Sequence, residues 1–193
     1  VCDVKKPMRE RAAGYVAKKY GGGDCAASAD FREILARDDI DAVTIATTDQ
    51  WHVPAAYYAA LAGKDMYCEK PLGVSLENEK KLRDTIRRTG RVFQFGTQER
   101  SSRNTRFGCE LVLNGYIGEV TAITVSSRYS RAAESYPPQP VPDWIDYDRW
   151  LGPAPWAPFC PQRVQNRFWF HMSDYALGFI AGWGIHTIDM ATW

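Results

Sequence analysis

Two short motifs place groups that could move a proton at the ends of predicted strands. Thr47 and His52 follow the apolar run at residues 42–46, and Glu69-Lys70-Pro71 follows a similar run at residues 65–68. Short β-branched runs between helical patterns are typical of buried parallel strands. Open parallel sheets bind ligands beyond the carboxyl ends of their strands. The sequence therefore predicts a ligand site at this edge, equipped with a lysine, a histidine and hydroxyl groups.

Lys70 is the strongest candidate for a catalytic group. It is held between a strand and Pro71, whose ring fixes the backbone and removes a donor. An ammonium placed in this way can donate a proton or stabilise a negative oxygen. The plainer interpretation is a surface ion pair with Glu69, which would contribute at most about 1 kcal/mol.

His186 is the second candidate, in the segment Gly182-Trp183-Gly184-Ile185-His186. Asp189 is three residues further on, so the two side chains would share one face of a helix. A carboxylate beside an imidazole can set its tautomer or raise its pKa. A zinc site is the competing hypothesis, but the three histidines are too widely spaced, and no metal is expected.

The residues that follow the predicted strand at residues 42–46 have two interpretations. The hydroxyl groups of Thr47 and Thr48, with backbone N–H groups at a helix start, suit phosphates or an amide-bearing ring. Simple capping of a helix that begins near Trp51 is the alternative, and for Asp49 capping is preferred. His52 would lie in the first helical turn, where the helix dipole favours a neutral ring.

Asp3 ends the first strand-like run and could face an adenosine ribose. In a dinucleotide-binding fold, an acid at this place accepts hydrogen bonds from ribose hydroxyls and disfavours a 2′-phosphate. A solvated loop aspartate is the alternative. Gly21-Gly22-Gly23 does not supply the phosphate-binding turn, because it follows a helical pattern and not a strand.

The composition is that of an ordinary globular chain of one to two domains. Its 193 residues are 45% hydrophobic and 24% charged, with a net charge of +1, so neither nucleic acid nor a membrane is an expected partner. No apolar run reaches the roughly 18 residues of a membrane span.

The five cysteines form no C-x-x-C pair, which favours reduced thiols and a cytoplasmic location. The first residue is not methionine, so export to the periplasm stays open.

Strand and helix patterns alternate up to Gly118, which predicts a parallel sheet with helices on both faces. Pro7 opens a helix with an apolar stripe that ends at Tyr20, and Ser75 caps another that Gly90 closes. Residues 120–129 then alternate between apolar and polar, which predicts a strand of a second sheet. The predicted domains are therefore 1–118 and 119–193. The other expected elements are helices at 31–37, 53–61 and 103–114, and strands at 1–3 and 92–95.

Taken together, these motifs resemble one family. Ile45-Ala46-Thr47, His52, Glu69-Lys70-Pro71-Leu72 and Gly184-x-His186-x-x-Asp189 resemble the Gfo/Idh/MocA oxidoreductases in order and spacing. The runs at residues 94–100 and 150–156 strengthen the resemblance, which covers essentially the whole chain.

The resemblance implies a Rossmann domain followed by the start of an α/β domain with an open antiparallel sheet. It implies NAD, with NADP possible, a sugar, inositol or related polyol as substrate, and a homo-oligomer for the full-length protein. Lys70 and His186 match the family's catalytic residues. The implied cofactor-binding residues are Asp3, Ala46, Thr47, Thr48, His52, Glu69, Lys70 and Gln98. The implied substrate-binding residues are Lys70, Arg167, Tyr175, His186 and Asp189.

The sequence departs from the family pattern at two places. The glycine fingerprint is not in this sequence, and Gly182 stands where the family often has an aspartate, four residues before the histidine. Asp174 or Tyr175 could replace that aspartate. Two alternatives to hydride transfer therefore remain: a glycoside hydrolase that keeps NAD bound, and a non-catalytic regulator that senses sugar and dinucleotide, which Gly182 favours.

Overall fold

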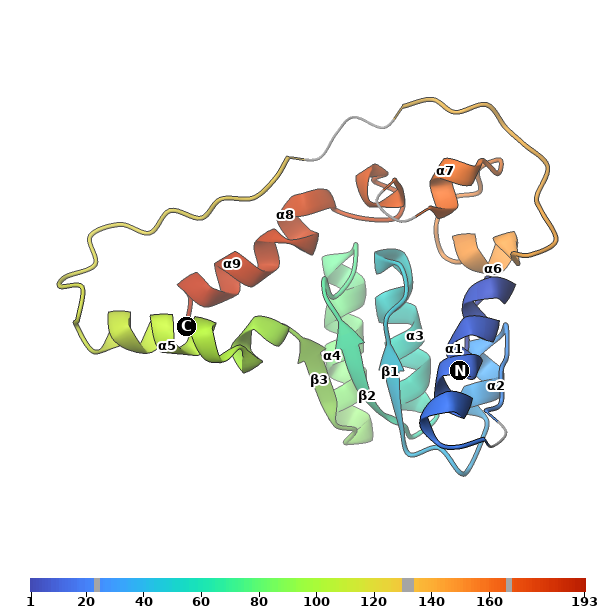
Figure 1. The fold of residues 1–193 in the computed structure, drawn as a ribbon, viewed down its shortest axis with the longest axis horizontal. Helices are drawn as coiled ribbons and strands as arrows, with labels where there is room; N and C mark the ends of the chain where they lie inside the picture. The colour runs from blue at the N-terminus through green and yellow to red at the C-terminus, as the bar shows by residue number, and fades with distance from the viewer. Residues whose placement is uncertain (23–24, 130–133, 166–167) are drawn as a thin grey trace.

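The computed structural model describes residues 1–22, 25–129, 134–165 and 168–193, and its centre is a parallel three-stranded sheet (Figure 1). The strand order is β1-β2-β3, and a helix connects each strand to the next. This arrangement is Rossmann-like and confirms the predicted fold class in its first half. The elements of this unit are β1 (Ala42–Ile45), α3 (Asp49–Leu61), β2 (Asp65–Glu69), α4 (Leu76–Thr89) and β3 (Phe93–Gly96).

The helix boundaries follow from capping groups in the sequence. The Ser75 hydroxyl accepts a hydrogen bond from the backbone N–H of Asn78, and Gly90 ends α4 in the left-handed conformation, with φ of 66°. Both features confirm the expected ends of this helix. None of the helices in the described part of the chain is long and apolar enough to cross a bilayer.

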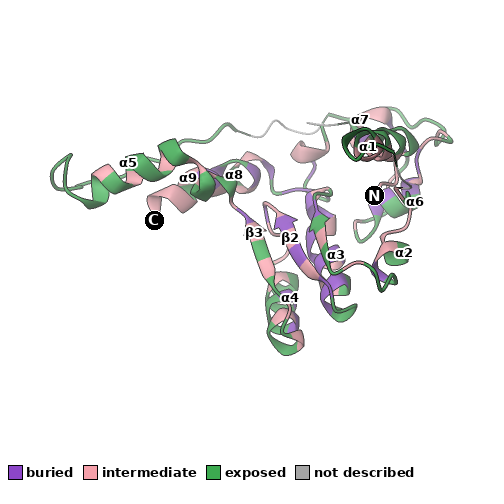
Figure 2. Cartoon of the chain, turned by 60° about the horizontal axis from the view of Figure 1, so that its bottom comes forward, coloured by how far each residue is buried: buried purple, intermediate pink, exposed green. Residues whose placement is uncertain are grey.

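One face of the sheet carries the first hydrophobic core. Helices α3 and α4 pack there, and the alanines of α3 allow close contact with the strands (Figure 2). The buried core residues are Leu35, Ile45, Val53, Ala55, Ala56, Ala59, Ala60, Met66, Cys68 and Leu82. On β1, in contrast, Ala42 and Thr44 are exposed. The prediction of helices on both faces is therefore wrong for β1 in the described structure, because no helix covers its second side.

Close approach between β2 and β3 depends on a glycine at the carboxyl edge of the sheet. Gly96 pairs with Glu69, and a Cβ at Gly96 would lie 2.9 Å from the Glu69 Cα and 3.0 Å from the Cys68 carbonyl oxygen. A larger residue would push the strands apart. The backbone that leads into Lys70 is therefore fixed by direct contact with the neighbouring strand.

The N-terminal segment is less regular than the sequence predicts. In place of a strand tail, Cys2 forms a single parallel bridge with Ser28. Helix α1 (Lys6–Lys19) begins with the expected proline but buries none of its residues, and Tyr20 is exposed. Of the predicted apolar stripe, Ala12 and Val16 are half-buried, while Met8 and Tyr20 at its ends are exposed. Helix α2 (Phe31–Leu35) confirms the next predicted helix.

A second, aromatic core lies in the C-terminal part of the chain and is docked onto α3. It surrounds α6 (Tyr147–Leu151), α7 (Pro161–Val164) and the short helix η2 (Trp169–His171). The Trp51 indole N–H lies 2.9 Å from the Arg149 carbonyl oxygen and 3.2 Å from that of Trp150. Its ring lies so close to Gly152 that no Cβ fits there. Trp51 therefore joins the Rossmann-like unit to the second core.

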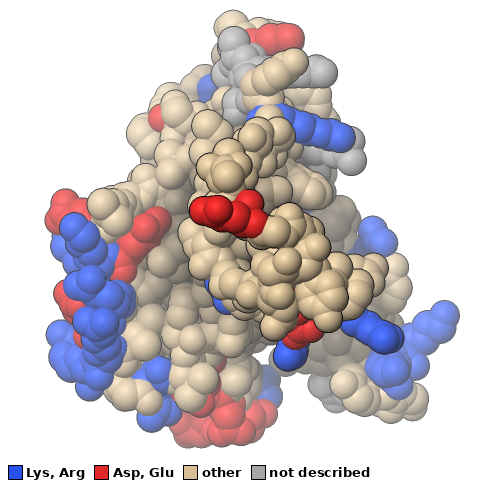
Figure 3. Space-filling model, turned by 90° about the vertical axis from the view of Figure 1, so that its left-hand side faces the viewer, with Lys and Arg blue, Asp and Glu red and all other residues tan. Residues whose placement is uncertain are grey.

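The strand predicted at residues 120–129 is not present. After η1 (Gln98–Ser101) and α5 (Arg103–Leu113), this segment is extended, exposed and without a partner strand among the described residues. Alternating sequence forms a strand only when another strand accepts its hydrogen bonds. In Figure 3 the middle of the face is uncharged, and charged side chains gather toward its sides and bottom. The exposed apolar residues between the end of α5 and residue 129 include Leu113, Tyr116, Ile117 and Ile123.

Two helices lie beside the carboxyl edge of the sheet. In Figure 1, α8 (Gly178–Gly182) and α9 (Gly184–Ala191) extend from above the β3 side of the sheet toward α5. They bring residues from the end of the chain to the motif that follows β2. All five cysteines are free, as expected.

Candidate functional site

Lys70 and His186 come together at the carboxyl edge of the sheet. The half-buried Lys70 side chain leaves the end of β2, and its Nζ donates a hydrogen bond to the Gly182 carbonyl oxygen at 2.8 Å. That carbonyl lies where α8 ends, and His186 follows in the first turn of α9 with only 6% of its surface exposed. The fold therefore brings an ammonium and an imidazole near one another at this edge.

The surroundings of His186 favour the neutral imidazole. Burial lowers its pKa below the ordinary 6.5, and the positive charge of Lys70 lowers it further. Its Nδ1 atom is buried and has no hydrogen-bond partner among the described residues. A neutral ring with an unused nitrogen can accept a proton at neutral pH.

His52 joins the two loops that carry the predicted motifs. It is 1% exposed, with Nδ1 2.6 Å from the Pro71 carbonyl oxygen and Nε2 3.2 Å from the Thr47 carbonyl oxygen. Burial lowers its pKa, in keeping with the expected neutral ring. His52 is buried between the two loops, so its ring supports the backbone that carries Thr47 and Lys70.

Asp49 is the residue that sequence reasoning placed wrongly. Thr48 is the N-cap of α3, while Asp49 is the first residue inside the helix and is only 2% exposed. Its Oδ2 atom has no hydrogen-bond partner in the described structure. Burial raises the pKa of this carboxyl to about 7, and the only opposing charge is Lys70, which lowers it. The sequence did contain a signal for this burial, because Asp49 stands between an apolar strand and an apolar helix. Helix capping was preferred as the simpler interpretation, and it is wrong.

The position of the family's aspartate is filled by an aromatic ring. A Cβ built on Gly182 would overlap the ring of Phe170, which in turn packs edge-on against Phe179 at 5.2 Å. No side chain fits at Gly182 unless Phe170 moves. The missing carboxylate therefore leaves no empty space beside His186.

Asp189 makes an ion pair that the sequence did not suggest. Its two oxygens accept hydrogen bonds from the Arg100 guanidinium at 2.7 and 2.9 Å, which ties α9 to η1. The hypothesis that Asp189 sets the His186 tautomer by a direct hydrogen bond is therefore wrong, since both oxygens face Arg100. Its charge still acts weakly to raise the pKa of His186.

The other predicted site residues lie at different depths. The Glu69 carboxylate accepts hydrogen bonds from the Tyr67 hydroxyl and the Lys70 N–H, both at 3.3 Å. Gln98 is exposed on η1.

The predicted substrate-binding residue Tyr175 is fully buried, and its hydroxyl accepts a hydrogen bond from Arg163. Asp174 is exposed. Arg167 lies outside the described residues. Ligand contacts by these side chains remain predictions.

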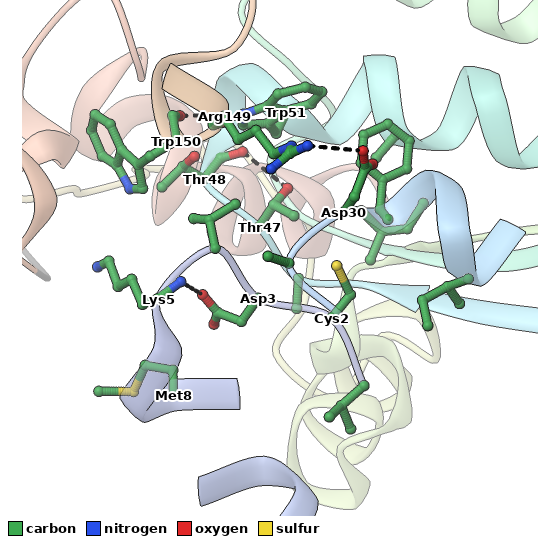
Figure 4. A pocket seen from close by; sticks show the side chains of 18 of the residues that line it. Cys2, Asp3, Lys5, Met8, Asp30, Thr47, Thr48, Trp51, Arg149 and Trp150 are labelled. Carbon is green, nitrogen blue, oxygen red and sulfur yellow. Dashed lines mark hydrogen bonds and ion pairs between the residues drawn. The ribbon is translucent and has the colours of Figure 1, made fainter. Parts of the chain in front are cut away.

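A cavity of about 1000 Å³ opens beside the carboxyl end of β1. Figure 4 shows Thr47 and Thr48 on its upper side, Asp3 below them, and Trp51, Arg149 and Trp150 along the wall. Arg149 reaches Asp30 at 3.4 Å. The second core therefore contributes part of this wall, which the sequence analysis did not anticipate.

Two of the predicted cofactor-binding residues, Asp3 and Thr47, line this cavity. One oxygen of Asp3 accepts the Lys5 N–H at 2.8 Å, which orients the carboxylate, and its contact with a ribose stays a prediction. The exposed Ala46 and Thr47 extend the rim toward Lys70. A glycine turn between a strand and a helix, which would hold the phosphates, is not among the described residues.

Comparison with known proteins identifies the family. A model described as "Oxidoreductase family, NAD-binding Rossmann fold" matches residues 2–97, and one described as "Oxidoreductase family, C-terminal alpha/beta domain" matches residues 99–193. The chain therefore belongs to the Gfo/Idh/MocA oxidoreductase family, and the predicted resemblance is confirmed. The domain boundary at Gly118 stays a prediction.

Individual relatives differ in their named activities. The chain is 30% identical over 127 residues to an alpha-N-acetylgalactosaminidase of Shewanella oneidensis, which covers 62% of this chain and 27% of that protein. A myo-inositol 2-dehydrogenase from Lactobacillus plantarum has a TM-score of 0.53 at 24% identity, covering 62% of this chain and 34% of that one. An NAD-binding protein from Listeria innocua has a TM-score of 0.61 at 22% identity, covering 98% and 43%. At these identities the two structures show the shared fold. The chain spans about a quarter of the length of the curated relatives it matches.

Proposed function

We propose that this chain carries the catalytic cleft of a nicotinamide-dependent oxidoreductase that acts on a secondary alcohol of a sugar, inositol or related polyol. The observation that carries the proposal is the convergence of Lys70 and His186, with the Lys70 Nζ held 2.8 Å from the Gly182 carbonyl oxygen. Family membership supports the same reaction class. NAD is the proposed cofactor, because the Asp3 carboxylate would repel the 2′-phosphate of NADP.

The two residues divide the proton chemistry between them. His186, neutral because burial and Lys70 lower its pKa, takes the proton of the substrate hydroxyl. The Lys70 ammonium stabilises the negative charge that develops on that oxygen. A bound nicotinamide would supply the acceptor for the hydride that leaves the carbon bearing this oxygen. In the reverse direction His186 returns the proton to the new hydroxyl.

Glycoside cleavage is the second candidate, and one observation favours it. The relative named alpha-N-acetylgalactosaminidase shares 30% identity over 62% of this chain. Cleavage through transient oxidation would use the same base and the same ammonium, but it would return the hydride to the sugar. The two reactions therefore differ in whether reduced cofactor accumulates.

The deciding experiment measures both reactions with the full-length protein. We expect NADH, followed at 340 nm, to accumulate with NAD and at least one member of a panel of inositols and free sugars. The same protein is assayed with p-nitrophenyl N-acetyl-α-galactosaminide. Cleavage of that glycoside without net NADH formation would replace the first proposal by the second.

Matched variants connect the activity to the cleft. Lys70→Ala and His186→Ala should each reduce turnover by about 10²–10⁴-fold, the usual contribution of a positioned acid or base. Lys80→Ala removes an exposed lysine on α4 and should leave turnover unchanged. Full activity in both cleft variants would reject the site for either reaction.

A further inference from the structure

Trp183 is a large apolar side chain that stays open to solvent beside the proposed base. It is 62% exposed, and its ring centroid lies 6.2 Å from that of His186, with the two ring planes 76° apart. These values describe an edge-to-face aromatic pair. A single exposed apolar residue needs no explanation by itself. The contact with His186 is what distinguishes Trp183 from Trp156, which is also exposed.

The backbone fixes Trp183 between the two groups of the proposed site. The residue lies between α8 and α9, where its N–H donates to the Phe179 carbonyl oxygen at 2.9 Å and its own carbonyl oxygen accepts the His186 N–H at 3.1 Å. The carbonyl of the preceding residue, Gly182, holds the Lys70 Nζ at 2.8 Å. A molecule that lies against the indole would therefore be next to both Lys70 and His186.

The two helices around Trp183 offer aromatic surface and no unpaired carboxylate. The side-chain space at Gly182 is filled by the Phe170 ring. Asp189, the one acid of α8 and α9, is paired with Arg100 through both of its oxygens. This part of the site is therefore suited to an apolar surface of a ligand, and not to a pair of hydroxyls that a carboxylate would bind.

A cyclic polyol has such an apolar surface. Where its hydroxyls are equatorial, the axial C–H bonds form an apolar face on each side of the ring. An aromatic ring covers this face favourably, because apolar surface of both partners leaves water and the C–H groups meet the negative face of the π-system. The hydroxyls at the edge of the polyol stay free for hydrogen bonds with Lys70 and His186, whose Nδ1 atom has no partner in the described structure.

We propose that Trp183 binds the substrate by stacking on the C–H face of a six-membered sugar or inositol ring, and thereby selects rings whose hydroxyls are equatorial. The choice of ligand rests on the function proposed above. An axial hydroxyl on the stacked face would hold the ring away from the indole and would lose hydration without a new partner. Binding should therefore weaken when both faces of the ring carry an axial hydroxyl.

The test measures the binding of two inositols to the full-length protein by titration calorimetry. In scyllo-inositol all hydroxyls are equatorial, whereas D-chiro-inositol has an axial hydroxyl on each face. Saturating NADH is present, because it cannot accept a hydride and so prevents turnover. The wild type should bind scyllo-inositol more tightly. Trp183→Ala should raise its Kd about tenfold and remove most of the preference, as for other buried tryptophan contacts. Trp183→Phe should keep most of both.

Two matched controls make the result specific. Ile180→Ala removes a 72% exposed apolar side chain from α8, and Trp156→Ala removes a 76% exposed indole outside the site. Both should leave the two Kd values unchanged. In turnover, Trp183→Ala should raise the KM for scyllo-inositol more than it lowers kcat, because stacking stabilises bound substrate and transition state alike.

The outcomes separate this proposal from the proposed reaction. If Trp183→Ala weakens binding and yet no alcohol is oxidised, the stacking stands and the oxidoreductase function fails. Equal Kd values for scyllo-inositol in the wild type and folded Trp183→Ala overturn the stacking, as does a wild type that binds neither inositol.

A second measurement covers the case in which Trp183→Ala does not fold. Fluorine NMR of wild type labelled with 5-fluorotryptophan follows the Trp183 resonance, assigned with Trp183→Phe. A shift of this resonance, but not that of Trp156, on addition of scyllo-inositol supports the proposal. An unmoved Trp183 resonance contradicts it.

Discussion

The Lys70 ammonium and the Gly182 carbonyl oxygen lie 2.8 Å apart, although 112 positions separate them in the chain. This contact joins the loop after β2 to the end of α8 and brings His186 close to Lys70. In the proposed reaction, a substrate hydroxyl would compete with this backbone carbonyl for Lys70.

Substitution at Gly182 should disturb packing more than chemistry. In Gly182→Ala the new Cβ would overlap the Phe170 ring, so we expect a loss of about 1–3 kcal/mol in the free energy of unfolding, as for other overpacked sites. Urea denaturation followed by fluorescence measures it.

Gly184→Ala is the matched control for this prediction. It lies two residues away, and its nearest neighbour beyond the adjacent chain would be the Phe179 carbonyl oxygen at 3.6 Å. Adding Phe170→Leu to Gly182→Ala should restore part of the loss. Equal stability of the two alanine variants would show that Phe170 does not fill the position.

The buried Asp49 carboxyl should make stability depend on pH in a defined direction. Its pKa is about 7 in the folded protein and near 3.8 in the unfolded chain, so the folded state binds the extra proton between these values. This contribution to wild-type stability is present below pH 3.8 and is lost as the pH rises to 7. Asp49→Asn should therefore gain about 1–3 kcal/mol relative to the wild type between pH 4 and pH 7.5. Urea titrations at both pH values check this, and a constant difference would argue against a buried, uncharged acid.

Cofactor preference should depend on Asp3. Replacing it with serine removes the charge that repels a 2′-phosphate, so the preference of the full-length protein for NAD over NADP should narrow. Titration of both cofactors by fluorescence measures the ratio of the two Kd values. Asp39→Ser, at an exposed acid paired with Arg37, is the control. A ratio that Asp3→Ser leaves unchanged would remove Asp3 from the cofactor site.

The charge of Lys70 should be visible in the titration of His186. Because the ammonium lowers the pKa of His186, Lys70→Met should raise it toward the ordinary value. Carbon-13 NMR of the imidazole Cε1 measures the midpoint without any substrate. The kcat/KM of the wild type for alcohol oxidation should be constant above pH 6.5 and fall only below it. An unmoved midpoint in Lys70→Met would mean that the two groups do not interact.

The sequence was informative where local chemistry decides the structure. The helix caps at Ser75 and Gly90 and the strand before Lys70 could be predicted, because caps and strand runs are local signals. The approach of His186 to Lys70, 116 positions away, was expected from the family resemblance and not from any local signal. The depth of a side chain is not a local property. Asp49 was taken for a cap because its burial depends on a segment that begins more than 120 positions later, at Tyr175.

Contacts between distant segments also explain why the predictions for residues 120–129 and for the space beside Gly182 are wrong. The alternation at residues 120–129 predicts a strand, but pairing requires a partner that the described structure does not provide. Nothing in the sequence near Gly182 indicates that Phe170 fills its side-chain space. Both features depend on contacts between distant segments, which a single sequence does not reveal.

The central claim is that Lys70 and His186 act as one catalytic unit, and a double-mutant cycle tests it most directly. Turnover is measured for the full-length wild type, Lys70→Ala, His186→Ala and the double variant, with NAD and the best alcohol substrate. Groups that act together are strongly non-additive. We therefore predict that the double variant is about as slow as the slower single variant, within about tenfold. A double variant whose loss equals the product of the two single losses would contradict the account.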